Sequence, residues 1–382
     1  MTERPESSTD EPPRQGDTLR RGWTTGACAT AATKAACSAL LGFGFPDPVT
    51  IRLPGGQAPA FALAWQERGA DWAASGIIKD AGDDPDVTHG AMVRARVSAA
   101  QPGQGVVFKA GDGVGTVTQP GLPVPVGEAA INPVPRQMMT ETVQDLARDA
   151  GLCADFVVEI SIPGGDALAR HTLNARLGIV GGLSILGTTG IVIPYSCAAW
   201  IASIHRGIDV ARSLGLDHVA ACTGNRSEVA VTRRHGLPET ALLDMGHFAG
   251  GTLKYLRKHP VPRLTVAGGF AKMSKLGQGY MDLHSKRHAV DTGWISDRLA
   301  GLGASPATVA EARQSPSASR ILQLAARDGL PLGDDIARLA RDTALRTLGP
   351  DSTTQVEALV INRDGTVIGE APWTTAHQLI PR

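Results

Sequence analysis

DHVAACTGNRSEVAVTRRHG, residues 217–236, is the stretch that decides the fold. A run of small apolar residues leads through Thr223 and Gly224 into a segment with helical spacing, so we expect a strand, a tight turn and a helix. The same order recurs downstream in TALLDMG followed by HFAGGTLKYLRKHP. A third predicted strand, RLTVAGG, then leads into an expected loop, FAKMSKLGQGYMDLHSKR. Strand–turn–helix units in succession are typical of a parallel sheet.

The preceding part of the chain has a different pattern. The alanine-rich segment from Thr25 to Gly42 predicts a helix, and AMVRARVSAA alternates as a half-buried strand does. We therefore expect a mixed α/β and α+β fold with a polar, disordered tail at its start. The expected parts are the tail over 1–17, an N-terminal α+β domain over 18–175, a Rossmann-like parallel-sheet domain over 176–304, and C-terminal helices with a closing hairpin over 305–382 packed on the core.

Composition excludes several classes of protein. Lys and Arg number 37 and Asp and Glu also 37, and aromatic residues make up 4%, so neither charge nor stacking surface favours a nucleic-acid partner. Five cysteines without a CxxC pair, and no secretory signal, indicate a cytoplasmic protein. Residues 177–204 carry no charge, but glycines and Pro194 interrupt them, so we expect buried strands and no membrane span.

The turns after the predicted strands are the candidate ligand site. Ligands of parallel α/β sheets bind at the carboxyl ends of strands, where helix N-termini favour acceptor groups. Neither a GxGxxG nor a Walker A motif is present, and each glycine also fits an ordinary tight turn. The candidate cofactor-binding residues are Gly181, Gly182, Thr188, Thr189, Thr223, Gly224, Asn225, Asp244 and Gly246.

Basic and hydroxyl groups supply candidates for binding an anion. Lys272 and Lys275 lie in an expected glycine-flanked loop after a predicted strand, and we expect them to meet an anionic ligand. Thr24, Thr25 and Cys28 open the alanine-rich helix, where free N–H groups favour a carboxylate. A plain N-cap, with Cys28 as a small buried residue, is the structural alternative.

An acidic segment begins at Lys79, which precedes four carboxylates in KDAGDDPD, residues 79–86. Its spacing does not fit a calcium loop. Crowded carboxylates can provide a general base or contact a ligand, although a solvated acidic turn explains the segment equally well. The histidines include no HExxH motif, so we predict no protein-bound metal.

Seven blocks together resemble the cobalt-precorrin-5B C(1)-methyltransferase family, in that family's order and over about residues 18 to 300. The blocks are LRRGWTTGACATAATKAA, KDAGDDPDVTHG, GVGTVTQPGLPVPVGEAAINPVPR, GGLSILGTTGIVIPYS, TGNRSE, MGHFAGG and GGFAKMSKLGQGYMDLHS.

The resemblance implies that S-adenosylmethionine methylates C1 of a cobalt-bearing tetrapyrrole, giving cobalt-precorrin-6A in cobalamin biosynthesis. Cobalt would then belong to this corrinoid substrate only. Lys79, Lys272, Lys275 and the helix start at Thr24 would contact the substrate's carboxylate arms. If a proton leaves the ring, Asp83, Asp84 or His247 is the candidate acceptor.

Two other functions stay open at this point. One is a nucleotide-dependent enzyme, an oxidoreductase or phosphotransferase, that uses the same turns, and the other is a non-catalytic corrinoid carrier. A homo-oligomer and transient contact with other cobalamin-pathway enzymes are also compatible with the sequence.

Overall fold

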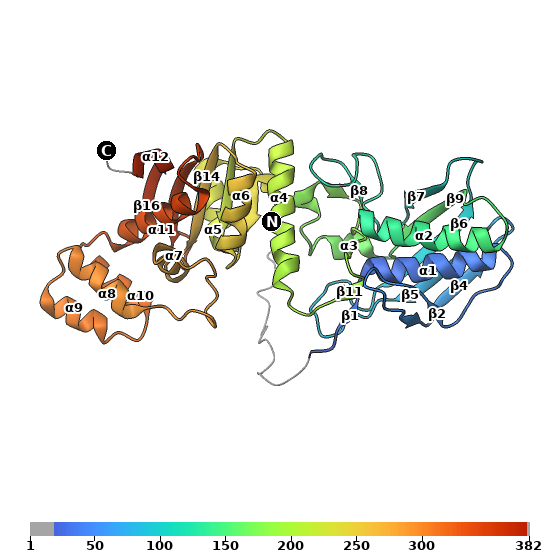
Figure 1. Ribbon diagram of the computed structural model, residues 1–382. Helices are drawn as coiled ribbons and strands as arrows, with labels where there is room; N and C mark the ends of the chain where they lie inside the picture. The colour runs from blue at the N-terminus through green and yellow to red at the C-terminus, as the bar shows by residue number, and fades with distance from the viewer. Residues whose placement is uncertain (1–18, 380–382) are drawn as a thin grey trace. The chain divides into compact units, whose positions relative to one another are not determined.

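The computed structural model describes residues 19–379, so the tail expected over 1–17 lies outside the described residues. By its internal contacts the chain divides into unit 1, residues 1–197, and unit 2, residues 198–382 (Figure 1). Both units mix helices and strands, and both contain parallel strand pairs. No helix in the described range is long and apolar enough to cross a membrane.

Unit 1 is built on a five-stranded sheet of order β4-β5-β6-β9-β7, antiparallel except where β7 runs parallel to β9. The strands are β4 (Trp65–Arg68), β5 (Trp72–Ile78), β6 (Met92–Ala99), β7 (Val106–Ala110) and β9 (Phe156–Ser161). The expected alternation of β6 is confirmed, with Val93, Ala95 and Val97 buried. On the opposite face, Arg94 and Arg96 stack over Trp65 and Trp72.

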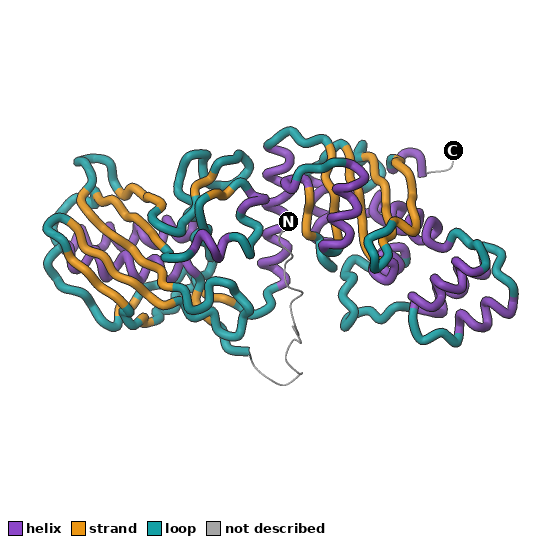
Figure 2. Tube along the Cα trace, turned by 180° about the vertical axis from the view of Figure 1, so that it is seen from behind, coloured by secondary structure: helices purple, strands orange, loops and turns teal. Residues whose placement is uncertain are grey.

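Two helices cover the apolar face of this sheet, α1 (Thr25–Leu40) and α2 (Pro133–Asp149). In Figure 2 the strands of unit 1 lie in front and these helices behind them. Helix α1 confirms the predicted alanine-rich helix. It is buried nearly all round, because alanine, cysteine and threonine let the sheet and α2 approach closely.

The remaining segments of unit 1 form short two-stranded pairs. They are β1 (Gly22–Trp23) with β11 (Ile191–Val192), β2 (Val49–Thr50) with β3 (Ala60–Phe61), and β8 (Thr116–Val117) with β10 (Ile179–Val180), beside the short helices α3 (Gly165–Ala169) and η1 (Ala175–Leu177). Because β10 and β11 pair antiparallel with strands of unit 1, residues 176–197 belong to that unit. The expected boundary after residue 175 is corrected accordingly.

Unit 2 contains a second five-stranded sheet, of order β13-β12-β14-β15-β16. Its strands are β12 (His218–Cys222), β13 (Leu242–Asp244), β14 (Arg263–Gly269), β15 (Gln355–Ile361) and β16 (Val367–Thr374). The first four are mutually parallel and β16 is antiparallel to β15. The predicted parallel strands at 217–222 and 263–269 are thus present.

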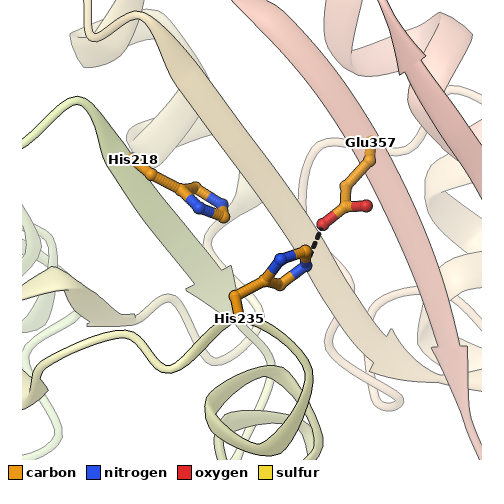
Figure 3. A group of neighbouring side chains, drawn as sticks. All are labelled: His218, His235 and Glu357. Carbon is orange, nitrogen blue, oxygen red and sulfur yellow. Dashed lines mark ion pairs between the residues drawn. The ribbon is translucent and has the colours of Figure 1, made fainter.

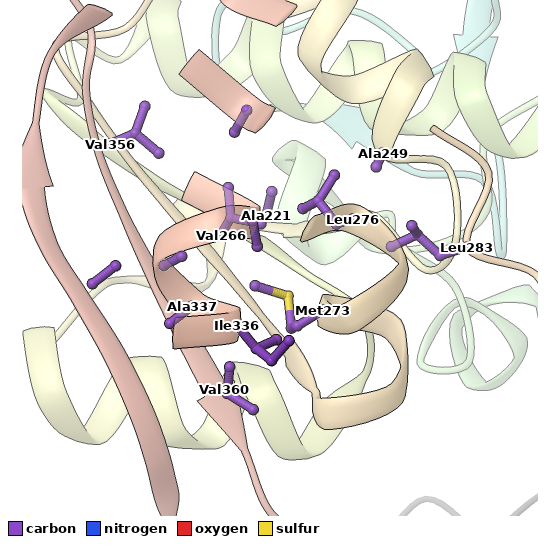
Figure 4. Close-up of a cluster of buried hydrophobic side chains, with 14 of the residues drawn as sticks. Ala221, Ala249, Val266, Met273, Leu276, Leu283, Ile336, Ala337, Val356 and Val360 are labelled. Atoms are coloured by element: carbon purple, nitrogen blue, oxygen red, sulfur yellow. The ribbon is translucent and has the colours of Figure 1, made fainter. Parts of the chain in front are cut away.

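Helices pack on both faces of this sheet. Apart from η2 (Glu239–Ala241), they are α4 (Cys197–Ser213), α5 (Asn225–His235), α6 (Ala249–Lys258), α7 (Phe270–Gly277), α8 (Thr292–Gly301), α9 (Pro306–Arg313), α10 (Ala318–Arg327), α11 (Leu332–Leu348) and α12 (Ala376–Leu379). One face packs on α5, while the other carries the larger core with α4, α6, α7 and α11. Val266, Met273 and Ile336 lie in this core (Figure 4).

The C-terminal part is integral to unit 2. The hairpin predicted at Asp364-Gly365 is confirmed, with Gly365 at φ +86° in the turn between β15 and β16. However, β15 lies parallel beside β14, where Arg263 pairs with Gln355. Residues 305–382 therefore complete the sheet of 198–304 instead of packing on it as a separate part.

Candidate functional site

Three turns of unit 2 leave the parallel sheet at the same edge. Cys222, the last residue of β12, pairs with Asp244 at the end of β13 and with Ala267 near the end of β14. We call the turns that follow, residues 223–225, 244–247 and 268–272, the strand-end site. The sequence pattern predicted that these residues meet, and the topology brings them together because the three strands are parallel.

Lys272 holds two of these turns together. The loop expected after β14 is corrected, because residues 270–277 form helix α7. Lys272 lies in its first turn, and its Nζ donates to the carbonyl oxygens of Thr223 (3.0 Å) and Gly246 (3.3 Å). Burial lowers the pKa of Lys272, while the carboxylate of Asp244 opposes this effect. A cation half-buried at the strand ends fits the expectation of an anionic ligand there.

Small residues let the turns approach one another. A Cβ on Gly268 would lie 2.7 Å from both Cγ2 and Oγ1 of Thr223, so any other residue here would displace the Thr223 side chain. Gly246 has φ +58°, in the left-handed region. Gly224 precedes α5, which begins at Asn225 without a side-chain cap. Such a helix start favours negatively charged or acceptor groups of a ligand.

Trp200 belongs to the strand-end site and was missed by the sequence analysis. Its Nε1 donates to the carbonyl oxygen of Asp244 (3.0 Å), and its ring lies over Gly246, yet the residue stays 44% exposed. The indole is therefore fixed at the site while a large part of it faces solvent. The only sequence signal was a tryptophan among small apolar residues in CAAWIAS.

His247, an expected proton acceptor, packs beside Phe248 and His284, with 4.8 Å between the centres of the two imidazole rings. Burial lowers the pKa of His247, with Asp282 opposing and His284 adding to the effect. The imidazole is therefore neutral at pH 7 and able to take a proton. Among the expected acceptors it is the one that lies at the strand-end site of unit 2.

The ammonium group of Lys275 is bonded to the segment that follows α7. The residue is 2% exposed, and its Nζ donates to the carbonyl oxygen of Leu283 (3.2 Å). Leu283 in turn donates its N–H to the carbonyl oxygen of His247. Lys275 therefore holds the segment that packs against His247, and its part in substrate binding stays a prediction.

The remaining candidates lie in unit 1. Thr24 is the N-cap of α1, with Oγ1 accepting from the N–H of Ala27 (3.2 Å). Thr25 is buried, and Cys28 is fully buried in the core, where burial raises the pKa of its thiol to about 12. The structure thus favours the capping alternative and leaves the Cys28 thiol no access to a substrate.

Lys79 forms an internal ion pair. It is 1% exposed, and its Nζ lies 2.5 Å from Oδ2 of Asp86. Burial works against ionisation of Asp86, but Lys79 and two hydrogen bonds from Thr88 outweigh it and lower the pKa of Asp86. The ammonium group of Lys79 is therefore paired with Asp86 inside the protein, which argues against a contact between Lys79 and the substrate.

Asp83 and Asp84 tie the acidic turn to other parts of unit 1. Asp83 accepts the backbone N–H of Arg20 (2.6 Å), and Asp84 accepts that of Tyr195 (2.8 Å). Arg20 also pairs with Asp80 in the same turn. These contacts give the acidic segment a structural role in joining β1 and β11 to the sheet, and its role as a general base stays a prediction.

The glycine-rich loop between β10 and β11 also belongs to unit 1, not to the parallel sheet. Gly181 and Gly182 follow β10, and a Cβ on Gly182 would lie 2.3 Å from the carbonyl group of Gly113. Thr188 and Thr189 are exposed. Within unit 2, the cofactor candidates that the fold brings together are Thr223, Gly224, Asn225, Asp244 and Gly246.

The chain is similar in sequence to one family of known proteins. Residues 12–194 match the CbiD family model, and residues 282–372 match the model of the CbiD C-terminal domain. A protein of Paramagnetospirillum magneticum named cobalt-precorrin-5B C(1)-methyltransferase is 60% identical over 92% of this chain and 98% of its own length. The chain belongs to the CbiD family. The resemblance seen in the sequence blocks is thereby confirmed.

Further relatives carry the same name. Those of Bradyrhizobium sp. and Rhodospirillum rubrum are each 56% identical, over 95% and 93% of this chain. A crystal structure of the cobalamin biosynthesis protein cbiD from Archaeoglobus fulgidus is 26% identical, with a TM-score of 0.38, and covers 70% of this chain and 83% of its own. In this CbiD family member, the blocks TGNRSE, MGHFAGG and GGFAKMSKLG supply all three turns of the strand-end site.

Proposed function

We propose that this protein transfers the methyl group of S-adenosylmethionine to C1 of cobalt-precorrin-5B, giving cobalt-precorrin-6A in cobalamin biosynthesis. The observation that carries the proposal is the 60% identity to a relative of that name over nearly the whole of both chains. The cobalt ion is part of the corrinoid substrate. We place the reaction in the cytoplasm, and a homo-oligomer or transient contact with pathway enzymes remains part of the proposal.

The residues of the strand-end site fit the methyl donor. Its turns follow the carboxyl ends of parallel strands, and in parallel α/β sheets a nucleoside is expected there, beside a helix start. The uncapped start of α5 suits acceptor groups, and Lys272 suits a carboxylate. Trp200 offers a fixed aromatic surface to a planar ring. When bound, S-adenosylmethionine would supply an electrophilic methyl group on its sulfonium.

The protein's own contribution is alignment and exclusion of water. Methyl transfer proceeds in line, so the site must hold the ring carbon and the donor within reach, and such positioning accounts for about 7–11 kcal/mol of a barrier. Lys272 and the turns it joins provide a rigid surface for this purpose. The lowered pKa of His247 supports it as the acceptor of a proton that leaves the ring.

The decisive experiment is incubation of the purified protein with cobalt-precorrin-5B and S-adenosylmethionine carrying an isotope-labelled methyl group. We expect the label at C1 of the product, located by NMR and mass spectrometry, together with release of S-adenosylhomocysteine. A product without the label, or with the label on another carbon, would refute the proposal.

Binding measurements distinguish the alternatives. Calorimetric titration with S-adenosylhomocysteine should give one site per chain, whereas NAD(H) and ATP should give none. Binding of NAD(H) or ATP in its place would indicate a nucleotide-dependent enzyme. Binding of the corrinoid alone, without turnover, would indicate a carrier.

A further inference from the structure

Three potential metal ligands meet in unit 2 away from the strand-end site. They are His218 at the start of β12, His235 at the end of α5, and Glu357 in β15 (Figure 3). One ligand atom of each lies within 4.8 Å of those of the other two. His218 and Glu357 stand toward the amino-terminal ends of parallel strands, whereas the strand-end site lies at their carboxyl ends.

The carboxylate of Glu357 is the centre of the cluster. The residue is 2% exposed, and its Oε1 accepts a hydrogen bond from the Thr265 hydroxyl (2.6 Å). The same hydroxyl lies 2.7 Å from Nε2 of His218. Nε2 of His235 approaches Oε1 of Glu357 to 2.5 Å. Two imidazole nitrogens and one carboxylate oxygen therefore gather around a single threonine hydroxyl.

His235 lacks a properly directed hydrogen bond. Its Nε2 is buried and has no hydrogen-bond partner among the described residues, although the Glu357 oxygen is only 2.5 Å away. An imidazole lone pair and a carboxylate oxygen at this separation repel one another unless a proton or a metal ion lies near both, and with a proton the contact is an ion pair. A proton would satisfy the pair only along the N–H direction, which does not point at the oxygen. A metal ion near both atoms would remove the repulsion.

The donor set selects the kind of ion. Two imidazoles and one carboxylate form a set that zinc adopts in proteins, whereas calcium and magnesium need more oxygen ligands. Trp373 lies edge-on to the imidazoles of His218 and His235, with ring centres 5.1 Å and 6.0 Å apart. This aromatic wall limits access of water to the cluster.

We propose that His218, His235 and Glu357 bind one divalent transition-metal ion, with zinc as the best-suited, and that the Thr265 hydroxyl or a water takes the fourth position. The ion would join the end of α5 to strands β12 and β15, so its role is structural. The proposal is independent of the methyltransferase function. Sequence spacing could not reveal it, because the ligands come from three separate elements.

The test measures zinc on the full-length protein produced without a polyhistidine tag. Cys153 and Cys197 are exposed thiols, and thiolate is a zinc ligand. Cys153→Ser and Cys197→Ser therefore form the background of every sample, which removes adventitious binding at these positions. We expect mass spectrometry of the metal content to give one zinc per chain, and X-ray absorption to show nitrogen and oxygen ligands. Removal by a chelator should lower the melting temperature, and added zinc should restore it.

Two variants test the assignment of ligands. His235→Gln and Glu357→Gln should each weaken zinc affinity by about tenfold or more, since loss of only a hydrogen-bond partner of a metal ligand typically costs about 10–100-fold, and loss of the ligand itself should cost at least as much. His171→Gln replaces an exposed histidine in unit 1 and should bind zinc as the background protein does. Circular dichroism identifies any variant that fails to fold. If a variant does not fold, the proposal is tested by the zinc content per chain and the ligand atoms of the parent protein.

Three results would overturn the proposal. The first is a parent protein that retains no zinc after exposure to it, which would show that the three side chains do not form a metal site. The second is a set of sulfur ligands in the absorption spectrum. The third is equal zinc affinity of His235→Gln, Glu357→Gln and the background protein, which would show an adventitious ion only.

Discussion

The ammonium group of Lys272 lies 3.0 Å from the carbonyl oxygen of Thr223, and this hydrogen bond connects the start of α7 to the end of β12. A second hydrogen bond, to Gly246, connects the same group to the turn after β13. One partly buried cation therefore sets the separation of two turns and supplies positive charge between them.

Replacing Lys272 with methionine should weaken binding of S-adenosylhomocysteine by about tenfold or more, because hydrogen bonds to a charged group contribute about 1.5–3 kcal/mol. Lys258→Met, at the exposed end of α6, is the matched control and should bind normally. Isothermal titration calorimetry measures both. Equal affinity of the two variants would remove Lys272 from the proposed site.

Gly268→Ala should destabilise unit 2 by about 1–3 kcal/mol, the usual cost of overpacking. The new Cβ would lie 2.7 Å from the Thr223 side chain and would push the turns apart. At the next residue, Gly269, a Cβ meets nothing closer than 4.0 Å and φ is −65°, so Gly269→Ala should change stability by less than about 0.5 kcal/mol. Urea unfolding compares the pair, and equal stability would contradict the close approach.

Lys79→Met should destabilise unit 1, since it leaves the Asp86 carboxylate without its ion-pair partner. Removing one partner of a buried ion pair costs about 3–5 kcal/mol of unfolding free energy. Because the Asp86 side chain is 27% exposed, we expect a loss of about 3 kcal/mol or less. Lys79→Met combined with Asp86→Asn should lose less than the sum of the single changes. Additive losses in urea unfolding would show that the two residues do not interact.

Asp80 should titrate at unusually low pH. The hydrogen bond from Arg20, followed by that from the Gly82 N–H, lowers the pKa of Asp80 to about 2 from 3.8. Because the folded value is the lower one, the resulting stability is present above about pH 4 and is lost as pH falls toward 2. NMR titration of the carboxyl carbon measures this value. In Arg20→Gln the midpoint should rise toward 3.8, and an unchanged midpoint would exclude the pairing.

Two of the five thiols should react quickly with a thiol reagent in the folded protein. Cys153 and Cys197 are exposed, whereas Cys28, Cys37 and Cys222 are buried. Burial also raises the pKa of Cys28 and Cys37 to about 12, which leaves almost no thiolate at pH 8. Quantitative labelling should give five thiols in denaturant, and rapid labelling of Cys28 in the native state would contradict its burial.

Local patterns predicted the elements that local interactions decide. The small apolar run at 218–222 and the glycine turn after it became β12 and the start of α5, and Thr24 capped its helix. Those patterns also placed the three turns of the strand-end site together, because parallel strands end at a common edge.

Long-range pairing and burial were beyond the sequence. Residues 179–180 and 191–192 read as strands, but nothing local showed that they pair with β8 and β1 of unit 1. In the sequence, Lys79 was interpreted as a cation available to a ligand. Asp86 becomes its ion-pair partner only when the turn folds. Trp200 was missed for the same reason, since its importance comes from the carbonyl of Asp244.

The position of β15 has a consequence for synthesis of the chain. Strand β14 pairs with β15, which is made only after helices α7 to α11. The strands that pair within unit 1, by contrast, have all been translated by residue 192. Unit 1 can therefore fold while the ribosome is still extending the chain, whereas the nascent unit 2 keeps an open, apolar sheet edge until Ile361 has emerged. Such an edge is a target for chaperones and for misassembly, so translation speed across the last third of the message should govern the yield of folded protein.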